Sequence, residues 1–174
     1  ASVVAVGSYL YGGDMLHAAD QGRIRVGLIG CGGRGTGAAI DCVTASGDVV
    51  ITAMGDLFAD CLEGSLRSLR EKLPERNLAV TPEHCFTGFD AFKKVLACEV
   101  DLVILAAPPF FRPMHLQEAV AAGKHVFMEK PVAVDPAGVR SVIASAEIAA
   151  RKNLGLVAGT QRRHQAHYIE VMKR

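Results

Sequence analysis

The segment from Gly30 to Gly35 has the composition of a turn that can hold a phosphate group. It follows a short apolar run, Ile24 to Ile29, and precedes a stretch with helical periodicity. In this pattern one glycine permits a tight turn, a second lets the backbone approach a pyrophosphate, and a third lets helix and strand pack closely. The context predicts a dinucleotide cradle, with a plain flexible turn as the alternative. Its residues are Gly30, Cys31, Gly32, Gly33, Arg34 and Gly35.

Asp56 places a carboxylate where a ribose-binding acid is expected. It follows a second apolar run, 49–54, and lies 21 residues after Gly35, close to the spacing of about 20 residues typical of such acids. A carboxylate there accepts hydrogen bonds from the ribose hydroxyls and repels a 2′-phosphate, so NAD is favoured over NADP. Arg34 keeps NADP open, and a helix N-cap is the alternative role for Asp56.

Glu129, Lys130 and Pro131 end another apolar run, His125 to Met128. Ligands of open α/β sheets bind at the carboxyl ends of the strands, which is where this charged pair is expected. A lysine beside a nicotinamide ring can exchange a proton with a substrate hydroxyl. From chemistry alone, a solvated surface lysine is the alternative.

Short β-branched runs alternate with helical stretches from Arg23 onwards, which is typical of βαβ units. We therefore predict an α/β fold: a Rossmann-type, doubly wound parallel sheet with helices on both faces, formed by residues 23–174 after an N-terminal arm, 1–22. The near-continuous apolar run 100–106 predicts a central strand. The expected strands are 24–29, 49–54, 85–86, 100–106, 125–128 and 154–158.

Helix boundaries are indicated by capping residues. Thr87 is expected to cap a helix with Phe89, Phe92, Val95 and Leu96 on one side, and Gly123 to end a helix over 113–122. Asp135 and Pro136 are expected to begin a long helix whose inner face carries Val139, Val142, Ile143, Ala146 and Ala149 or Ala150. Residues 75–83 are expected to form a loop.

Composition excludes several other functions. The 174 residues carry a formal net charge of +1, so no broad charged field indicates nucleic acid or a membrane surface. The five cysteines form no C-x-x-C pair and no zinc-ligand cluster. We expect them to be small buried hydrophobes, and we expect no metal site and no stable membrane span.

The two ends of the sequence carry further expectations. Residues 1–19 are apolar and small-residue-rich, like an export signal that lacks its charged beginning, which would make the protein exported or periplasmic. The alternative is a frayed arm or short strand on a cytoplasmic protein. Because the sequence stops at Arg174 inside a helical pattern, we expect it to be a fragment.

The ordered motifs together resemble the Gfo/Idh/MocA family, the glucose-fructose oxidoreductase and inositol dehydrogenase group. They are the run from Ile24 through Gly35, Asp101 to Pro109, His115 followed by 119–126, and Glu129 to Val134, and the resemblance covers 23–174. It implies that Lys130 is the catalytic lysine. It also implies that Ala107, Pro108 and Glu129 lie beside the nicotinamide half of the cofactor and that His115 lies near the same cleft. A packing histidine is the alternative for His115.

The segment 159–164, with Tyr168 one turn on, is similar to a branch of this family that often carries an export signal. That similarity implies substrate contacts by Gln161 and Arg163, with solvated side chains as the alternative. Family members have a second, α+β domain that completes the substrate site and the homo-oligomer interface. We expect that domain to be missing here, leaving Tyr168, Ile169, Val171 and Met172 exposed.

The resemblance implies that the chain is the cofactor-binding domain of an NAD(P)-dependent oxidoreductase. Its substrate would be a sugar, polyol or related hydroxyl compound. Two alternatives remain open: an NAD-dependent glycoside hydrolase that oxidises its substrate transiently, and a dinucleotide-sensing regulator without catalysis. The regulator would have no need of Lys130.

Overall fold

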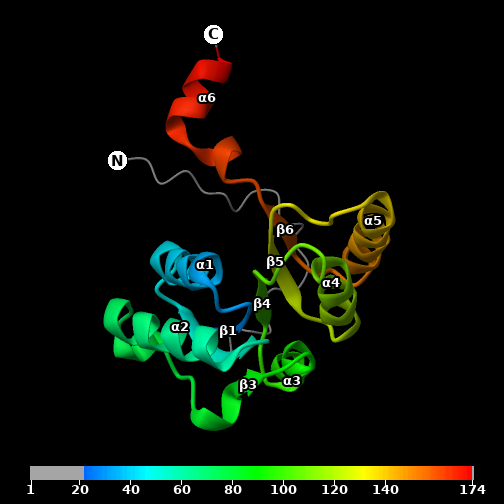
Figure 1. Cartoon of the computed structure of the whole chain (residues 1–174). Coiled ribbons are helices and arrows are strands. Elements are labelled where there is room, and N and C mark those ends of the chain that lie inside the picture. Colours follow the sequence, from blue (N-terminus) through cyan, green and yellow to red (C-terminus); the bar gives the residue numbers. More distant parts are fainter. Residues whose placement is uncertain (1–21, 174) are drawn as a thin grey trace.

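The computed structural model describes residues 22–173, and the expected N-terminal arm lies outside them except for Gly22. Six parallel strands form one sheet in the order β3-β2-β1-β4-β5-β6, with helices on both faces (Figure 1). The predicted Rossmann-type fold is therefore confirmed. The strands are β1 (Ile24–Ile29), β2 (Val49–Asp56), β3 (Cys85–Thr87), β4 (Leu102–Leu105), β5 (His125–Glu129) and β6 (Leu156–Gly159).

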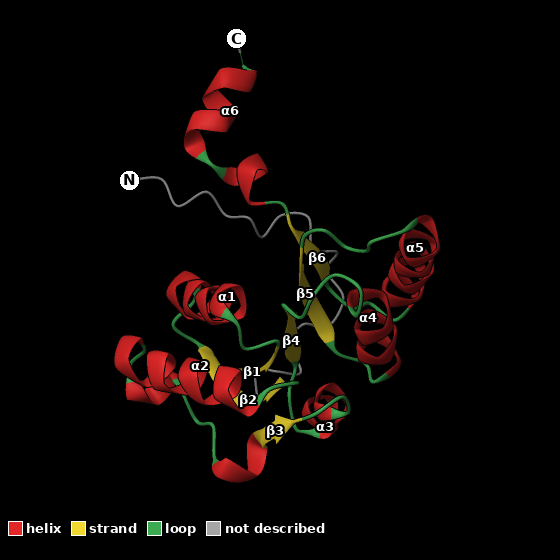
Figure 2. Cartoon of the chain, viewed as in Figure 1, coloured by secondary structure: helices red, strands yellow, loops and turns green. Residues whose placement is uncertain are grey.

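The helices follow the strands in the alternation that the sequence predicts (Figure 2). They are α1 (Gly33–Ala45), α2 (Ala59–Lys72), α3 (Ala91–Ala97), α4 (Arg112–Ala121), α5 (Pro136–Arg151) and α6 (Ala166–Met172). Three short 3-10 helices lie between them: η3 (Glu75–Asn77), η4 (Pro82–His84) and η5 (Gln161–His164). Residues 75–83 thus form most of the expected connection between α2 and β3, and it includes the single turns η3 and η4.

Strands β1 and β4 occupy the middle of the sheet and pair in register from Val26 opposite Leu102 to Ile29 opposite Leu105. Val103, Ile104 and Leu105 are almost fully buried, because the strand is covered on both faces. One hydrophobic cluster lies on the side of α1 and α2 and the other on the side of α3, α4 and α5. The predicted central strand is confirmed.

Two predicted caps are confirmed. The carboxylate of Asp135 accepts a hydrogen bond from the Gly138 N–H at 2.6 Å, as an N-cap residue of α5 should. Gly123 has a φ of +72° and follows α4, and this left-handed conformation is why a glycine ends the helix there.

Thr87 does not cap α3. It is the last residue of β3, where it pairs with Asp56 of β2, and the N-cap position is taken by Asp90. Phe92, Val95 and Leu96 are buried as expected, whereas Phe89 precedes the helix and is 75% exposed. The pairing of β3 with β2 thus extends one residue beyond the predicted strand 85–86, and α3 begins later than expected.

The inner face of α5 differs from the expected one. Val142 and Ala149 are buried, but Ser145 completes the buried row, and Val139 and Ile143 are exposed. The buried positions lie three and four residues apart and form one stripe, which the polar Ser145 obscures in the sequence.

Helix α6 stands clear of the sheet beyond the end of β6 (Figure 1). Its apolar side chains are exposed, as expected: Tyr168, Ile169, Val171 and Met172. Over residues 22–173, no helix has both the length and the hydropathy that a bilayer crossing requires.

Candidate functional site

The carboxyl ends of β1 and β4 form the switch point of the sheet. From β1 the chain moves outward through β2 and β3, and from β4 it moves the other way through β5 and β6. Connections leaving adjacent strands in opposite directions open a crevice at their carboxyl ends, where ligands of open α/β sheets bind. The segment Gly30 to Arg34 leaves β1 at this edge, and Ala107 and Pro108 follow β4 there.

Gly30 and Gly35 are required by the fold itself. Gly30 has a φ of +95°, and a Cβ there would lie 2.3 Å from the Ala107 backbone nitrogen. A Cβ on Gly35 would lie 1.8 Å from the Gly30 carbonyl oxygen. Both positions therefore exclude any side chain, as a turn that packs a helix closely onto its strand demands.

Gly32 and Gly33 differ, because a Cβ at either position would meet no atom within 4 Å. Gly32 is the N-cap of α1, its φ is −69°, no side chain caps the helix, and the first turn carries no acidic residue. The first amides of a helix have no intrahelical partner and carry the positive end of its dipole. This exposed, uncapped N-terminus has the donors and the space that a pyrophosphate needs.

Asp56 lies directly beside this turn. One carboxylate oxygen accepts a hydrogen bond from the Cys31 N–H at 2.5 Å, and the other accepts from the Phe58 N–H at 3.0 Å. The second bond, two residues along the chain, makes an Asx turn. Helix α2 begins at Ala59 with Phe58 as N-cap, so the alternative role of Asp56 as N-cap of α2 is not observed.

Glu129 ends β5 and is almost fully buried, at 1% exposure. Its Oε1 accepts a hydrogen bond from Arg34 Nη2 at 2.5 Å, whereas its Oε2 has no partner among the described residues. A Cβ on Gly159, which pairs with Glu129 in the sheet, would lie 2.9 Å from Oε1. The ion pair joins the glycine turn to the Glu129-Lys130-Pro131 motif, and it raises the pKa of Arg34.

Lys130 and Pro108 are both exposed, at the ends of β5 and β4. The structure thus brings the predicted cradle, the predicted ribose carboxylate and the predicted catalytic lysine to one edge of the sheet. Exposed Lys130, directly after β5, can therefore approach a ligand that binds at this edge of the sheet.

His115 is buried on α4, with 7% exposure. Its ring stacks on Phe92 at 4.2 Å between centroids and faces Phe111 at 6.0 Å. Burial, aided by the positive charge of Arg112, lowers its pKa to about 4. Its Nδ1 has no hydrogen-bond partner among the described residues. His115 is thus a neutral, packed side chain, which agrees with its alternative role as a packing histidine.

Arg112 is a residue of this edge that the sequence motifs do not single out. It is 4% exposed and donates hydrogen bonds through Nη2 to the Ala107 carbonyl oxygen at 2.8 Å and through Nη1 to that of Pro131. The signal that could have indicated it is its position: a cation in the first turn of a helix opposes the helix dipole and needs a compensating interaction.

Cys31 is buried inside the glycine turn, and burial raises the pKa of its thiol. The thiol is therefore protonated and unreactive at neutral pH. The other four cysteines are partly buried, and all five are free. Among residues 22–173, no group of histidine, cysteine and acidic side chains has the arrangement of a metal site.

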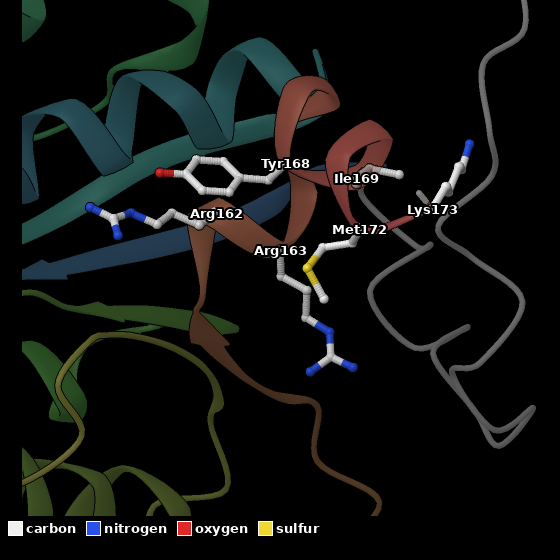
Figure 3. A pocket seen from close by; sticks show the side chains of 6 residues that line it. All are labelled: Arg162, Arg163, Tyr168, Ile169, Met172 and Lys173. Carbon is white, nitrogen blue, oxygen red and sulfur yellow. The ribbon is translucent and has the colours of Figure 1, made fainter.

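Gln161 and Arg163 lie on η5, beyond β6, and both side chains are exposed. A shallow pocket of about 380 Å³ lies between η5 and α6. Figure 3 shows Arg162 and Tyr168 side by side on one side of this pocket, with the guanidinium 5.6 Å from the ring centroid, and Arg163 pointing elsewhere. Arg163 lines this pocket together with Ile169 and Met172 of α6.

This chain matches known relatives over only part of the relatives' own length. A "Glycosyl hydrolase family 109 protein 2" from Shewanella sp. (strain ANA-3) is 30% identical over 130 residues, covering 74% of this chain and 27% of the relative. This chain therefore spans about a quarter of that relative.

Solved structures share the fold. One is scyllo-inositol dehydrogenase from Lactobacillus casei with bound NAD(H) and scyllo-inositol, with a TM-score of 0.68 and 22% identity over 87% of this chain and 40% of that one. Another is a 3-ketoreductase from Actinomadura kijaniata in complex with TDP-benzene and NADP, with a TM-score of 0.66 and 23% identity over 87% of this chain and 43% of that one.

The family comparison agrees with the geometry. Residues 24–157 match the GFO_IDH_MocA family, described as "Oxidoreductase family, NAD-binding Rossmann fold". This range contains the glycine turn, Asp56 and the Glu129-Lys130-Pro131 motif. The chain therefore belongs to the Gfo/Idh/MocA oxidoreductase family and carries its NAD-binding Rossmann fold.

Proposed function

We propose that the chain binds NAD across the β1–β4 crevice and that the complete protein transfers hydride between the cofactor and a sugar, polyol or related hydroxyl compound. The observation that supports this best is the meeting of three groups at one sheet edge. These are the uncapped N-terminus of α1 behind Gly32, the Asp56 carboxylate and exposed Lys130.

The bound nicotinamide supplies the hydride acceptor or donor. The chain's own residues then have separate tasks. The amides after Gly32 would bind the pyrophosphate, and the Asp56 carboxylate would accept hydrogen bonds from the ribose hydroxyls. Lys130 would hold or accept the proton of the substrate hydroxyl. Beyond these groups, the main contribution of the protein would be to orient the two reactants.

NAD is the proposed cofactor in preference to NADP. Asp56 is held beside the turn by the Cys31 N–H, so its charge would repel a 2′-phosphate. Arg34, the arginine of the turn, is paired with buried Glu129. Using Arg34 to bind the 2′-phosphate would leave that carboxylate buried without its hydrogen-bond donor, at a cost in free energy.

Replacing Lys130 tests the oxidoreductase proposal. In the complete protein, Lys130→Met should reduce turnover of its sugar or polyol substrate at least about 100-fold, the usual contribution of a general acid–base group. NAD binding should stay within about threefold, because Lys130 binds no phosphate in this proposal. Undiminished turnover would remove Lys130 from the mechanism.

A glycoside hydrolase is the second candidate, because the Shewanella relative carries that name. In that reaction the same hydride transfer would be transient and NAD would be regenerated within each turnover. The test is to give the complete protein free sugars and nitrophenyl glycosides. Net NADH formation with free sugars supports the dehydrogenase, whereas nitrophenol release without net NADH supports the hydrolase.

Substrate contacts by Gln161 and Arg163, and assembly into a homo-oligomer, are also proposed for the complete protein. Their support is the exposure of η5 and of the apolar side chains of α6, which remain available to a further surface.

A further inference from the structure

Arg112 occupies an unfavourable position for a cation. It is the first residue of α4 and is 4% exposed, so its charge faces the positive end of the helix dipole. Burial accordingly lowers the pKa of its guanidinium. Stability alone generally favours an apolar side chain at such a position, which raises the question of what the charge does there.

The guanidinium connects two segments that leave neighbouring strands. Nη2 donates to the carbonyl oxygen of Ala107, just after β4, and Nη1 donates to that of Pro131, just after β5. The buried carboxylate of Glu129 supports the charge, since it raises the pKa of Arg112. The planar fork of an arginine can reach two carbonyl oxygens at once, whereas a lysine is a single point charge.

The two segments carry the groups that the reaction needs. Pro108 follows Ala107, and Lys130 precedes Pro131. We propose that Arg112 is a positioning residue, which joins the Ala107 and Pro131 carbonyls and thereby fixes Lys130 relative to the nicotinamide side of the crevice. The inference rests on the proposed function, because the position of Lys130 relative to the Ala107 segment matters only if the reaction takes place at Lys130.

Amide hydrogen exchange on this chain tests the mechanical part. In Arg112→Lys, exchange of the amides at positions 111 and 112, which donate to the Pro108 and Pro109 carbonyl oxygens, should accelerate at least about tenfold, with little change in the sheet. Arg140→Lys, on the exposed side of α5, is the matched control and should leave these two amides unchanged. Equal exchange in Arg112→Lys and the unchanged chain would overturn the proposal.

Kinetics of the complete protein test the consequence for Lys130. Arg112→Lys should lower kcat by about 10- to 100-fold, because small displacements of a reacting group are costly, while the Kd for NAD stays within about threefold. Guanidinium ion should restore part of the rate to Arg112→Ala. Where Arg112→Ala does not fold, the lysine variant decides.

The outcomes separate this inference from the proposed function. Full kcat in Arg112→Lys, or a loss of NAD binding as large as the loss of kcat, overturns the role of Arg112 alone. Absence of turnover in the unchanged complete protein overturns the proposed function, and the positioning of Lys130 falls with it.

Discussion

Arg34 and Glu129 form an ion pair between the glycine turn after β1 and the end of β5, with Nη2 2.5 Å from Oε1. The carboxylate side chain is 2% exposed and the guanidinium side chain 47% exposed. The two most chemistry-rich segments of the sequence, 95 residues apart in the chain, are therefore coupled directly. In the sheet order, β4 lies between the two strands that this pair connects.

Removing Arg34 should destabilise the fold because the Glu129 carboxylate would remain buried without its hydrogen-bond donor. Arg34→Gln is expected to lose about 2 kcal/mol of unfolding free energy, a modest value because the guanidinium is half exposed. Urea denaturation measures it. Lys94→Gln, which breaks an exposed pair with Asp90, is the control and should cost about 0.5 kcal/mol or less. Equal losses in the two variants would mean that burial of Glu129 does not matter.

Gly35 and Gly64 should respond in opposite directions to alanine. Gly35→Ala forces a methyl group into the Gly30 carbonyl oxygen and should cost about 3 kcal/mol or more. Gly64 lies exposed in α2, and a methyl group there would meet no atom within 4 Å, so Gly64→Ala should gain about 0.5–1 kcal/mol. Thermal unfolding of both variants checks the pair, and a stable Gly35→Ala would contradict the packing described for α1 and β1.

His115 should make stability depend on pH. Its pKa is about 4 in the folded chain against an ordinary value of 6.5, so the unfolded chain binds the extra proton between these values. The contribution is fully present above pH 6.5 and is lost as pH falls towards 4. From pH 7 to pH 5 the loss should be about 2 kcal/mol.

The measurement is urea denaturation at both pH values. His115→Phe can still stack on Phe92 but has no titratable group, so its stability should fall by about 2 kcal/mol less over the same interval. Parallel profiles of unfolding free energy against pH for the two proteins would show that folding does not lower the pKa of His115.

Asp56 should control the choice between NAD and NADP. Asp56→Asn keeps the size of the side chain and removes the charge that repels a 2′-phosphate, although its Nδ2 cannot accept one of the two backbone N–H bonds that the carboxylate accepts. The ratio of NADP to NAD affinity should rise at least about tenfold, which corresponds to about 1.4 kcal/mol. Calorimetric titration with both cofactors measures the ratio. An unchanged ratio would assign cofactor choice to another residue.

Much of the site was predictable because backbone chemistry restricts it to particular residue types. The glycine turn needs Gly30 at positive φ and Gly35 against a carbonyl oxygen, and both follow from sequence spacing. Lys130 and Asp56 were predictable because they end apolar runs, and parallel strands bring such ends to one edge.

The features that the sequence did not predict depend on the direction of long side chains and on the packing of neighbouring ones. The sequence does not reveal that Arg112 turns inward to two carbonyl oxygens or that Arg34 reaches Glu129. Thr87 was expected to cap a helix, but pairing with Asp56 extends β3 through it. In α5, helix packing selects Ser145 for the buried stripe over the more apolar Ile143, because position on the face decides burial.

Gly32→Ala tests the central claim, that the turn after β1 is a cradle for NAD. A methyl group at this position meets nothing within 4 Å, so the fold should keep its melting temperature within a few degrees. Only the close approach of a pyrophosphate requires glycine there. By calorimetry, the unchanged chain should bind NAD and Gly32→Ala should bind it at least about tenfold more weakly. No NAD binding by the unchanged chain, or equal binding by the two proteins, would contradict the account.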